Sequence, residues 1–385
     1  MRHAIVTETW PPEVNGVALT VRQLAEGLQA RGHAVQVVRP RQPGDGDGDA
    51  SAPDRLLVRG LPLPRYPGLR FGLPATGALA RAWRAAPPDA VYVATEGPLG
   101  WSALRVARRL GIPAATGLHT RFDRYMRDYA LPVLEPVALH WLRRFHNHAD
   151  ATLVPTAELA RFLRGAGFRN VRLLARAVDT TCFDPRHRDP GLRREWGLDA
   201  DAPAVLHVGR IAAEKNLELA VRAFRALQAR RPAARMVWVG DGPERARLQR
   251  ENPDFVFAGL RRGRDLARHY ASADLFCFPS HSETFGNVTL EALASGVPVV
   301  AFDTGAAREH LRDGVDGAAV ALGDDRGFVD AVVRIGADDL LRGAMRMAAR
   351  SAVSGLRPQR VAADFEAILA QLALGRGLHG SVAAA

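Results

Sequence analysis

The sequence is almost devoid of lysine. Of its 52 basic side chains only Lys215 is a lysine, and the other 51 are arginines. A skew of this size is typical of nucleotide bias in a genome, so it carries little information about most positions. It does single out Lys215, because a chain that avoids lysine everywhere else has retained this one.

Cysteine is also scarce. Cys182 and Cys277 are too few and too far apart for a disulfide framework or a zinc site, and Cys277 lies in an apolar run typical of a small buried residue. The Asp-x-Asp pairs within 45–49 mimic a metal site but stand in a Gly-rich segment without a nearby third ligand. The sequence therefore predicts no metal and no cofactor.

Two further motifs are missing. No uncharged apolar run approaches the roughly 18 residues that span a bilayer, and the apolar run before the carboxylate of Glu8, residues 4–6, is only three residues long. We therefore expect a cytoplasmic protein whose membrane contact is peripheral. The dinucleotide fingerprint G-x-G-x-x-G is absent too, since the nearest candidate, 240–245, contains proline and ends in arginine. Its absence disfavours a nicotinamide enzyme.

Positive charge is concentrated in the first half of the chain. The net charge is +11, of which residues 1–190 carry +9 and residues 191–385 carry +2. Such a field favours an acidic partner: nucleic acid, an anionic membrane surface or a phosphorylated substrate. Aromatic residues make up only 7% of the chain, which disfavours a nucleic-acid surface built on base stacking. For any single arginine, a solvated surface position is the plain alternative.

The pattern along the chain predicts two α/β domains. Short apolar strands alternate with amphipathic helices, an arrangement typical of parallel sheets covered on both faces. Length also favours two domains, at roughly 150 residues each. We expect a Rossmann-like first domain at 1–178, a linker at 179–203, a second Rossmann-like domain at 204–355, and a closing helix and tail at 356–385. Ligands of such sheets bind at the carboxyl ends of the strands.

Two segments of the second domain follow predicted strands and carry charge. After the strand 204–208 come Gly209, Arg210 and Lys215, and two cations at this place suit a diphosphate. After the strand 275–278 come Glu283 and a predicted helix that begins near Gly286 and contains Glu291. The first turn of that helix offers free N–H groups to an anion, and the carboxylates suit sugar hydroxyls. The alternatives are a surface ion pair and charges that complement the helix dipole.

The first domain offers three candidate regions. Asn15 and Gly16 end the loop after the first strand, and His119 follows the strand 114–118. Two segments combine basic with aromatic residues, as helices that lie on a membrane surface do. These tentative acceptor and membrane residues are Arg65, Tyr66, Arg70, Phe71, Arg143 and Arg144.

In these residues and their order, the chain resembles retaining glycosyltransferases of family 4, which have the two-domain GT-B fold. The most specific match is 271–305, which contains the Glu-x7-Glu signature as Glu283 and Glu291. The segments 208–216 and 11–17 match as well. Within the family the chain is most similar to bacterial enzymes that glycosylate membrane lipids, including GDP-mannose-dependent α-mannosyltransferases.

The resemblance implies roles for the matching positions. Arg210 and Lys215 would hold the donor diphosphate without a metal, and Glu283 and His119 would contact the transferred sugar. Glu291 would bind the ribose. Backbone N–H groups would assist the diphosphate contacts, and they belong to Gly16, Gly286, Asn287 and Val288.

The sequence thus predicts transfer of a hexose, of mannose or glucose type, from a GDP- or UDP-linked donor to a hydroxyl of a lipid or lipid-linked acceptor, with an α-linkage. We expect the protein to lie peripherally on the inner face of the plasma membrane and to bind no nucleic acid. The alternatives are a nucleotide-sugar epimerase on the same fold and a transferase with a soluble or polysaccharide acceptor. An epimerase would convert the donor without any acceptor.

Overall fold

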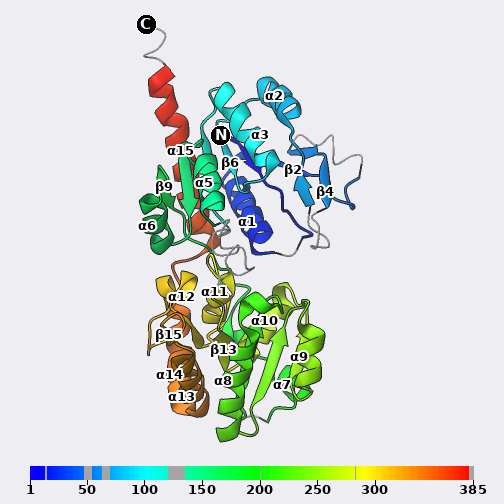
Figure 1. Ribbon diagram of the computed structural model, residues 1–385, viewed down its shortest axis with the longest axis vertical. Helices are drawn as coiled ribbons and strands as arrows, with labels where there is room; N and C mark the ends of the chain where they lie inside the picture. The colour runs from blue at the N-terminus through cyan, green and yellow to red at the C-terminus, as the bar shows by residue number, and fades with distance from the viewer. Residues whose placement is uncertain are drawn as a thin grey trace. The chain divides into compact units, whose positions relative to one another are not determined.

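The computed structural model describes residues 1–13, 15–46, 54–62, 70–119, 135–199, 201–281 and 283–380. The chain folds into two compact units. The first unit contains Met1–Arg176 together with Pro358–Ala385, and the second contains Ala177–Arg357. The C-terminal segment, which the sequence predicted as a closing helix, is therefore a part of the first unit (Figure 1).

The first unit is built on a sheet of seven described parallel strands in the order β3-β2-β1-β6-β7-β8-β9. Their bounds are β1 Arg2–Val6, β2 Ala34–Pro40, β3 Arg55–Val58, β6 Ala90–Val93, β7 Ala114–Gly117, β8 Ala151–Val154 and β9 Val171–Leu173. The helices are α1 Gly16–Ala30, α2 Thr76–Ala85, α3 Pro98–Arg109, α5 Glu135–His146, α6 Ala157–Gly165 and α15 Pro358–Gly380.

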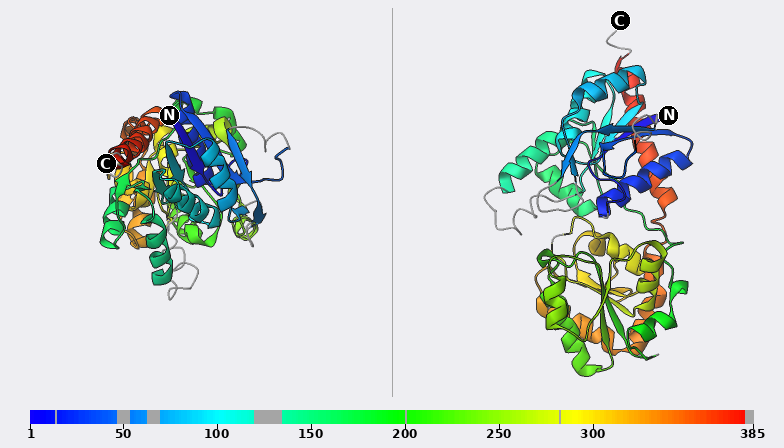
Figure 2. Two further views of the ribbon diagram at one scale, coloured as in Figure 1. Left: turned by 90° about the horizontal axis from the view of Figure 1, so that it is seen from above. Right: turned by 90° about the vertical axis from the view of Figure 1, so that its right-hand side faces the viewer.

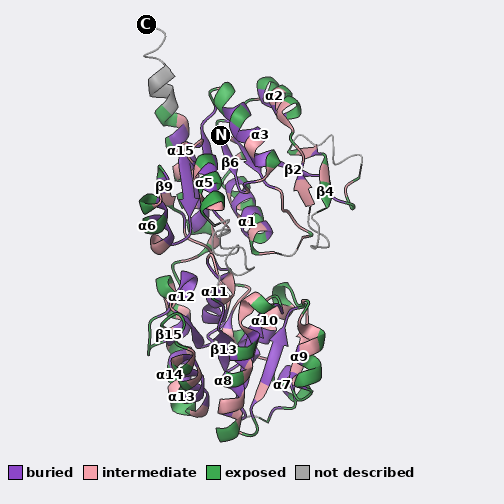
Figure 3. Ribbon diagram, viewed as in Figure 1, coloured by how far each residue is buried: buried purple, intermediate pink, exposed green. Residues whose placement is uncertain are grey.

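Both faces of this sheet are covered by helices, as continuous apolar strands require. Val6 and Val93 pack with Trp83 of α2 and Leu99 of α3 in one buried cluster. On the other face, α15 packs against α1 and β6. The inner strands β1, β6 and β8 are buried along most of their length, whereas the edge strands β3 and β9 are more exposed (Figure 3).

The second unit repeats this plan with six described parallel strands in the order β12-β11-β10-β13-β14-β15. The strands are β10 Ala204–Val208, β11 Arg235–Val239, β12 Val256–Gly259, β13 Leu275–Phe278, β14 Val299–Phe302 and β15 Gly317–Val320. The helices are α7 Pro190–Glu195, α8 Leu217–Arg230, α9 Arg245–Glu251, α10 Gly263–Ser272, α11 Asn287–Ala294, α12 Gly305–His310, α13 Asp325–Ala337 and α14 Asp339–Ala352. Helices flank this sheet on both sides (right view of Figure 2).

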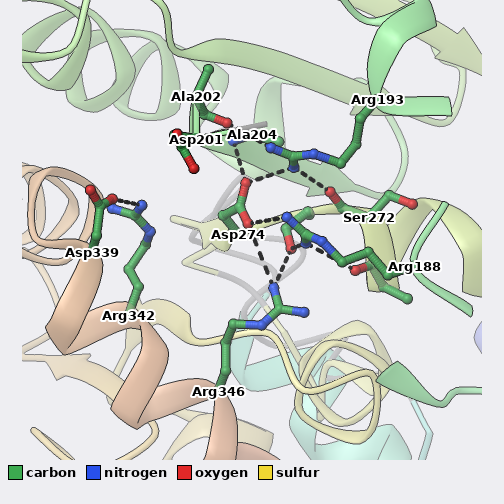
Figure 4. A network of polar contacts seen from close by, with 12 residues as sticks. Arg188, Arg193, Asp201, Ala202, Ala204, Ser272, Asp274, Asp339, Arg342 and Arg346 are labelled. Carbon is green, nitrogen blue, oxygen red and sulfur yellow. Dashed lines mark hydrogen bonds and ion pairs between the residues drawn. The ribbon is translucent and has the colours of Figure 1, made fainter. Parts of the chain in front are cut away.

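The segment 179–203, expected as a linker, packs onto the second unit. It forms the 3-10 turn Pro185–His187 and the helix α7, and Trp196 is buried in the core of that unit. Arg193 of α7 donates a 2.8 Å hydrogen bond to Asp274, and Arg188 donates another of 2.8 Å (Figure 4). Arg193, one of the residues that suggested a linker, is thus a buried ion-pair partner and Arg188 a half-buried one, a use that composition alone does not show.

The segment 59–74, which contains Arg70 and Phe71, includes two short strands. The antiparallel pair β4 Gly60–Pro62 and β5 Arg70–Gly72 runs through its described part, with Leu61 opposite Phe71. Proline and glycine obscured these two short strands in the sequence, because both residues are unfavourable in strand interiors.

Each sheet has one point at which the strand order reverses. In the second unit this point lies between β10 and β13, and in the first between β1 and β6. Open α/β sheets bind their ligands at such a switch point, beyond the carboxyl ends of the strands. The loops that follow β10 and β13 contain Lys215 and Glu283, and the fold therefore brings these two segments together.

Candidate active site

Lys215 and Glu283 meet at the switch point of the second unit. Lys215 ends the 3-10 turn Ala213–Lys215 after β10, and its ammonium donates a hydrogen bond to Glu283 Oε1. Ser280 donates a second, of 3.1 Å, to the same oxygen. Burial alone would raise the pKa of Glu283, but the charge of Lys215 holds it below its ordinary value. The pair is ionised, and 18% of each side chain remains exposed.

The Lys215–Glu283 pair keeps capacity for a ligand. An ammonium has three N–H donors, so Lys215 can bind a phosphate oxygen while it keeps Glu283. A small pocket lies beside Glu283, between the loops that follow β13 and β14. The residues that line it are Phe278, Ser280, Glu283, Phe285, Thr289, Ala301, Phe302, Thr304 and Ala307.

Arg210 lies on the exposed side of the same loop. Its side chain is 42% exposed and forms a 3.8 Å ion pair with Glu214, one turn further along. The backbone of Gly209 donates a 3.0 Å hydrogen bond to the Val239 carbonyl, which fixes the start of this loop to β11. The sequence grouped Arg210 with Lys215, but their contacts in the structure differ: Lys215 pairs with Glu283, and Arg210 with Glu214.

The helix α11 begins where the sequence expected it. Gly286 is its N-terminal cap, and its φ of 92° lies in the left-handed region that favours glycine. The Gly286 carbonyl accepts a 3.0 Å hydrogen bond from Thr289 N–H. Asn287 and Val288 form the first turn, whose N–H groups have no partner within a helix and carry its positive dipole end. This helix end is suited to an anion.

Glu291 lies further along α11 and has a separate partner. Tyr270 of α10 donates a 2.9 Å hydrogen bond to Glu291 Oε2. Burial raises the pKa of Glu291 to about 7, against the smaller opposing effect of Tyr270. Glu291 and Glu283 therefore differ in charge state: Glu283 is held ionised by a lysine, whereas Glu291 titrates near neutrality.

His207, in the strand β10, lies close to the charged pair. Its Nδ1 is 3.1 Å from the Cys277 carbonyl, so Nδ1 carries the proton and donates it. Burial lowers the pKa of His207 to about 4. The ring is neutral at physiological pH and packs against Trp238, with the ring centroids 4.5 Å apart. The sequence did not single out His207, because its position inside an apolar strand indicated only packing.

In the first unit, Asn15 is committed to the helix α1. Its Oδ1 accepts a 2.8 Å hydrogen bond from Ala18 N–H, and its side-chain amide donates one of 2.6 Å to Thr9. Asn15 is thus the N-terminal cap, a role that its residue type also predicts. Gly16, the first helical residue, is exposed, and its backbone is open to a ligand.

His119 follows β7 at the carboxyl edge of the first sheet, as expected. It contacts two residues that the sequence did not point to: Tyr92 Oη lies 2.9 Å from Nε2, and Arg176 donates to Nδ1. Burial, and then the charge of Arg176, lower the pKa of His119 well below 6.5. Neither partner carries a sequence motif, since Tyr92 is one aromatic residue in an apolar strand and Arg176 one of many arginines.

The basic residues assigned to a membrane surface fall into different settings. Arg65 and Tyr66 lie outside the described residues. Arg70 donates a 2.7 Å hydrogen bond to the Gly60 carbonyl, and Phe71 is half-buried. Arg143 donates to the Ala166 carbonyl at 3.3 Å, whereas Arg144 is exposed.

Arg144 shares its exposed face of α5 with apolar residues. Val137 is 63% exposed and Trp141 40%, and the spacing of four and three residues places all three on one side of the helix. Among the described residues, no helix is long and apolar enough to cross a membrane. In the same part of the chain, no group of three or more His, Cys, Asp or Glu residues is placed to hold a metal ion.

Comparison with known proteins decides the family. Residues 14–181 match the family described as glycosyltransferase family 4, and residues 202–338 match glycosyl transferases group 1. The chain is 37% identical over 339 residues to a GDP-mannose-dependent alpha-mannosyltransferase of Mycobacterium tuberculosis, covering 87% of this chain and 88% of that protein. The chain belongs to glycosyltransferase family 4. The expected class of enzyme, a glycosyltransferase, is thereby confirmed, and the epimerase alternative is set aside.

Other relatives of this family 4 glycosyltransferase agree with that result. A GDP-mannose-dependent alpha-mannosyltransferase of Corynebacterium glutamicum is 34% identical, with 84% of this chain and 78% of that protein covered. Sucrose-phosphate synthase of Thermosynechococcus elongatus has a similar structure, with a TM-score of 0.79 at 22% identity. That comparison covers 96% of this chain and 98% of the synthase. The structural likeness supports the expected GT-B fold.

Proposed function

We propose that this glycosyltransferase transfers mannose from GDP-mannose to a hydroxyl of a lipid or lipid-linked acceptor and forms an α-glycosidic bond. The observation that carries the proposal is the 37% identity, along 87% of the chain, to a GDP-mannose-dependent alpha-mannosyltransferase. The relative alpha-monoglucosyldiacylglycerol synthase of Streptococcus pneumoniae, 28% identical over 78% of the chain, supports a lipid acceptor.

The second unit supplies the contacts for the donor. Lys215 and the first turn of α11 bind the diphosphate, and Arg210 turns from Glu214 to a phosphate oxygen. The bond between the anomeric carbon and the phosphate oxygen breaks, and its electron pair stays on the diphosphate. Cations and oriented N–H groups that stabilise this growing charge lower the barrier.

The acceptor supplies the other half of the reaction. Its hydroxyl oxygen forms the new bond to the anomeric carbon, on the face from which the diphosphate departs, and its proton leaves with the diphosphate. Glu283 binds hydroxyls of the transferred sugar, and Glu291 binds the ribose. His119 contributes a contact to the sugar from the first unit. The soluble-acceptor alternative differs only in what presents the hydroxyl.

The proposed acceptor lies at a membrane surface. The first half of the chain carries +9 of the net charge, and α5 presents Val137, Trp141 and Arg144 on one exposed face. An apolar and aromatic helix face with a cation is suited to an anionic lipid headgroup region. We place the protein peripherally on the cytoplasmic face of the plasma membrane.

The test is a panel of nucleotide sugars followed by a transfer assay. GDP-mannose is expected to raise the melting temperature more than UDP-glucose or UDP-N-acetylglucosamine, because ligand stabilisation grows with the logarithm of affinity. Labelled mannose should then enter the organic phase when the enzyme receives lipid vesicles. Stabilisation by UDP-sugars alone would contradict the donor, and label that stays in water-soluble glycans would contradict the acceptor.

A further inference from the structure

Three polar side chains meet at the carboxyl edge of the first sheet. Tyr92 comes from β6, His119 follows β7, and Arg176 follows β9. Tyr92 Oη lies 2.9 Å from His119 Nε2, and Arg176 Nη2 donates to His119 Nδ1. The imidazole therefore has a partner on each ring nitrogen, and both partners belong to the first unit.

These contacts determine which nitrogen carries the proton. A guanidinium has five N–H donors and no acceptor, so Nδ1 of His119 must accept and carries no proton. A neutral imidazole then has its proton on Nε2, and Tyr92 Oη accepts it. The ring consequently presents Nε2–H, a hydrogen-bond donor.

The surroundings of the ring hold this arrangement in place. A Cβ at Gly117 would lie 2.1 Å from Tyr92 Oη and 2.6 Å from His119 Nε2, so only glycine leaves room for the contact. Phe365 of α15 packs edge-on against Tyr92, with the ring centroids 5.0 Å apart.

The charges that act on the ring come from two directions. Arg176 and His146 of α5 both disfavour a positive imidazole, in addition to its burial. Tyr92 on β6 is neutral, because burial raises its pKa, and Glu96 raises it further. Within the described part of the chain, no carboxylate is among the groups that shift the His119 pKa. The neutral ring is thus a result of burial and of nearby positive charge.

We propose that Arg176 is a positioning residue for sugar transfer, one that holds His119 as the neutral Nε2–H tautomer so that a substrate hydroxyl can share this proton with Tyr92 Oη. The guanidinium acts through the imidazole and does not touch the reacting atoms. The substrate hydroxyl in this inference rests on the proposed function, whereas the tautomer follows from the hydrogen bonds alone.

The first arm of the test is spectroscopic and needs no substrate. Arg176→Met removes the donor to Nδ1 and keeps an unbranched side chain, and the ¹⁵N signals of the His119 ring report the tautomer. His119→Gln identifies these signals among the twelve histidines. The parent protein should show a protonated Nε2 and no titration near pH 6.5. In Arg176→Met we expect a mixture of tautomers and a higher His119 pKa, which burial still holds below the ordinary value of about 6.5. An unchanged tautomer and titration would overturn the proposal.

A matched control comes from β9. Arg172 lies four residues before Arg176 and donates a 3.0 Å hydrogen bond to Gln371 at an exposed position, away from His119. Arg172→Met should leave the His119 signals unchanged. Arg176→Lys keeps a cation and a donor, so it should restore the Nε2–H tautomer at least in part.

The second arm is kinetic. Arg176→Met is expected to lower kcat about tenfold at pH 7.5, the worth of one net hydrogen bond, with little change in the KM for the donor. As the pH is lowered, its activity should fall at a higher pH than that of the parent, because His119 gains a proton more readily without Arg176. Arg176→Lys should recover most of kcat. A purely structural arginine would lower the melting temperature and leave the shape of the pH profile unchanged. Absence of transfer by the parent enzyme would contradict the proposed function and leave the spectroscopic result standing.

Discussion

Each edge of the second sheet places a carboxylate beside at least one cation, but the two sites have different roles. At the amino edge of β10 and β13, Asp274 binds Arg188 and Arg193, each at 2.8 Å, and also accepts a 2.9 Å hydrogen bond from Ala204 N–H (Figure 4). At the carboxyl edge of the same strands, Glu283 binds Lys215 and Ser280. At both sites, a carboxylate next to the two central strands pairs with one or more cations.

The difference lies in what each site leaves available. Asp274 is surrounded by cations, since Arg346 also lies 3.6 Å away, and these residues further donate to backbone carbonyls of 202 and 271–273. Its charge is fully committed to the protein. Lys215, by contrast, pairs among the described residues with the carboxylate of Glu283, which lines a small pocket. A saturated ion-pair network stabilises the fold, whereas an incompletely used cation can bind a ligand.

The largest effect is expected from Asp274→Ala. This change leaves several arginines without their buried partner, and breaking such a network costs about 3–5 kcal/mol. Urea denaturation of the second unit would measure the loss. The matched control is Asp265→Ala, in the first turn of α10, which removes the surface pairs with Arg261 and Arg268 and should cost about 1 kcal/mol or less. Equal losses in both variants would erase the distinction between the committed network and a surface pair.

The same network makes a prediction about acid. Burial alone would raise the pKa of Asp274, but Arg188 and Arg193 hold it below its ordinary value of 3.8. A folded-state pKa below the unfolded one gives stability that is fully present above pH 3.8 and is lost as the pH falls through the folded value. Acid titration of the parent protein should therefore show a stability loss below pH 3.8 that is smaller in Asp274→Asn.

Lys215→Ala is expected to lower the transfer rate strongly and to change the stability of the fold little. Removing one charge contact to a developing anion costs about 2.7–4 kcal/mol, or roughly 10²–10³ in rate. The transfer rate and the melting temperature should be measured on the same preparation. Lys215→Arg, which keeps the charge but changes its shape, should retain part of the rate. Turnover close to that of the parent would rule out the diphosphate contact.

Glu291 differs from Asp274 and Glu283, because its charge changes near neutral pH. Its pKa is raised to about 7, so it ionises as the pH rises through neutrality. If the ribose binds the ionised carboxylate, protonation of Glu291 should weaken binding. The affinity for GDP-mannose should then be about tenfold lower at pH 6 than at pH 8, because the ionised fraction of a single carboxyl group falls by that factor. Calorimetry with the intact nucleotide sugar avoids the titration of a terminal phosphate. Glu291→Gln should bind more weakly with a flat pH profile, and a slope that persists in it would assign the proton to another group.

The smallest effect concerns two neighbouring arginines of α5. Arg144 is exposed, whereas Arg143 donates to the Ala166 carbonyl. Arg144→Gln should weaken binding to phosphatidylglycerol vesicles about fivefold, since a basic residue near an anionic surface contributes about 1 kcal/mol. Arg143→Gln should change it little, and neutral phosphatidylcholine vesicles serve as the baseline. If the two variants lose binding equally, overall charge and not the face of α5 attracts the membrane.

Much of the fold followed from local patterns. The apolar strands after which Lys215, Glu283 and His119 stand were expected within a residue or two of their observed ends, because continuous apolar runs separated by helical periods are a strong local signal. The segment 179–203 was less tractable. Proline, aspartate and arginine are typical of linkers, and nothing local shows that Arg193 is buried against Asp274, some eighty residues further along the chain.

The candidate site shows the same limit. Its charged members could be named from the sequence because they follow strands and carry unusual residue types. Their partners could not be: Tyr270, Ser280, Tyr92 and Arg176 are ordinary residues made significant by proximity.

The sequence by itself determined the two α/β units, the family, and the residues that carry charge at the ends of the strands. These depend on periodicity, residue type and order along the chain. Only the tertiary structure decided how each charge is used. It showed that Arg143 faces inward while Arg144 is exposed, that Asn15 caps a helix, and that Lys215 pairs with Glu283. Hydrogen bonding and desolvation arise between residues distant in sequence, so a single scarce lysine gains its partner only when the chain folds.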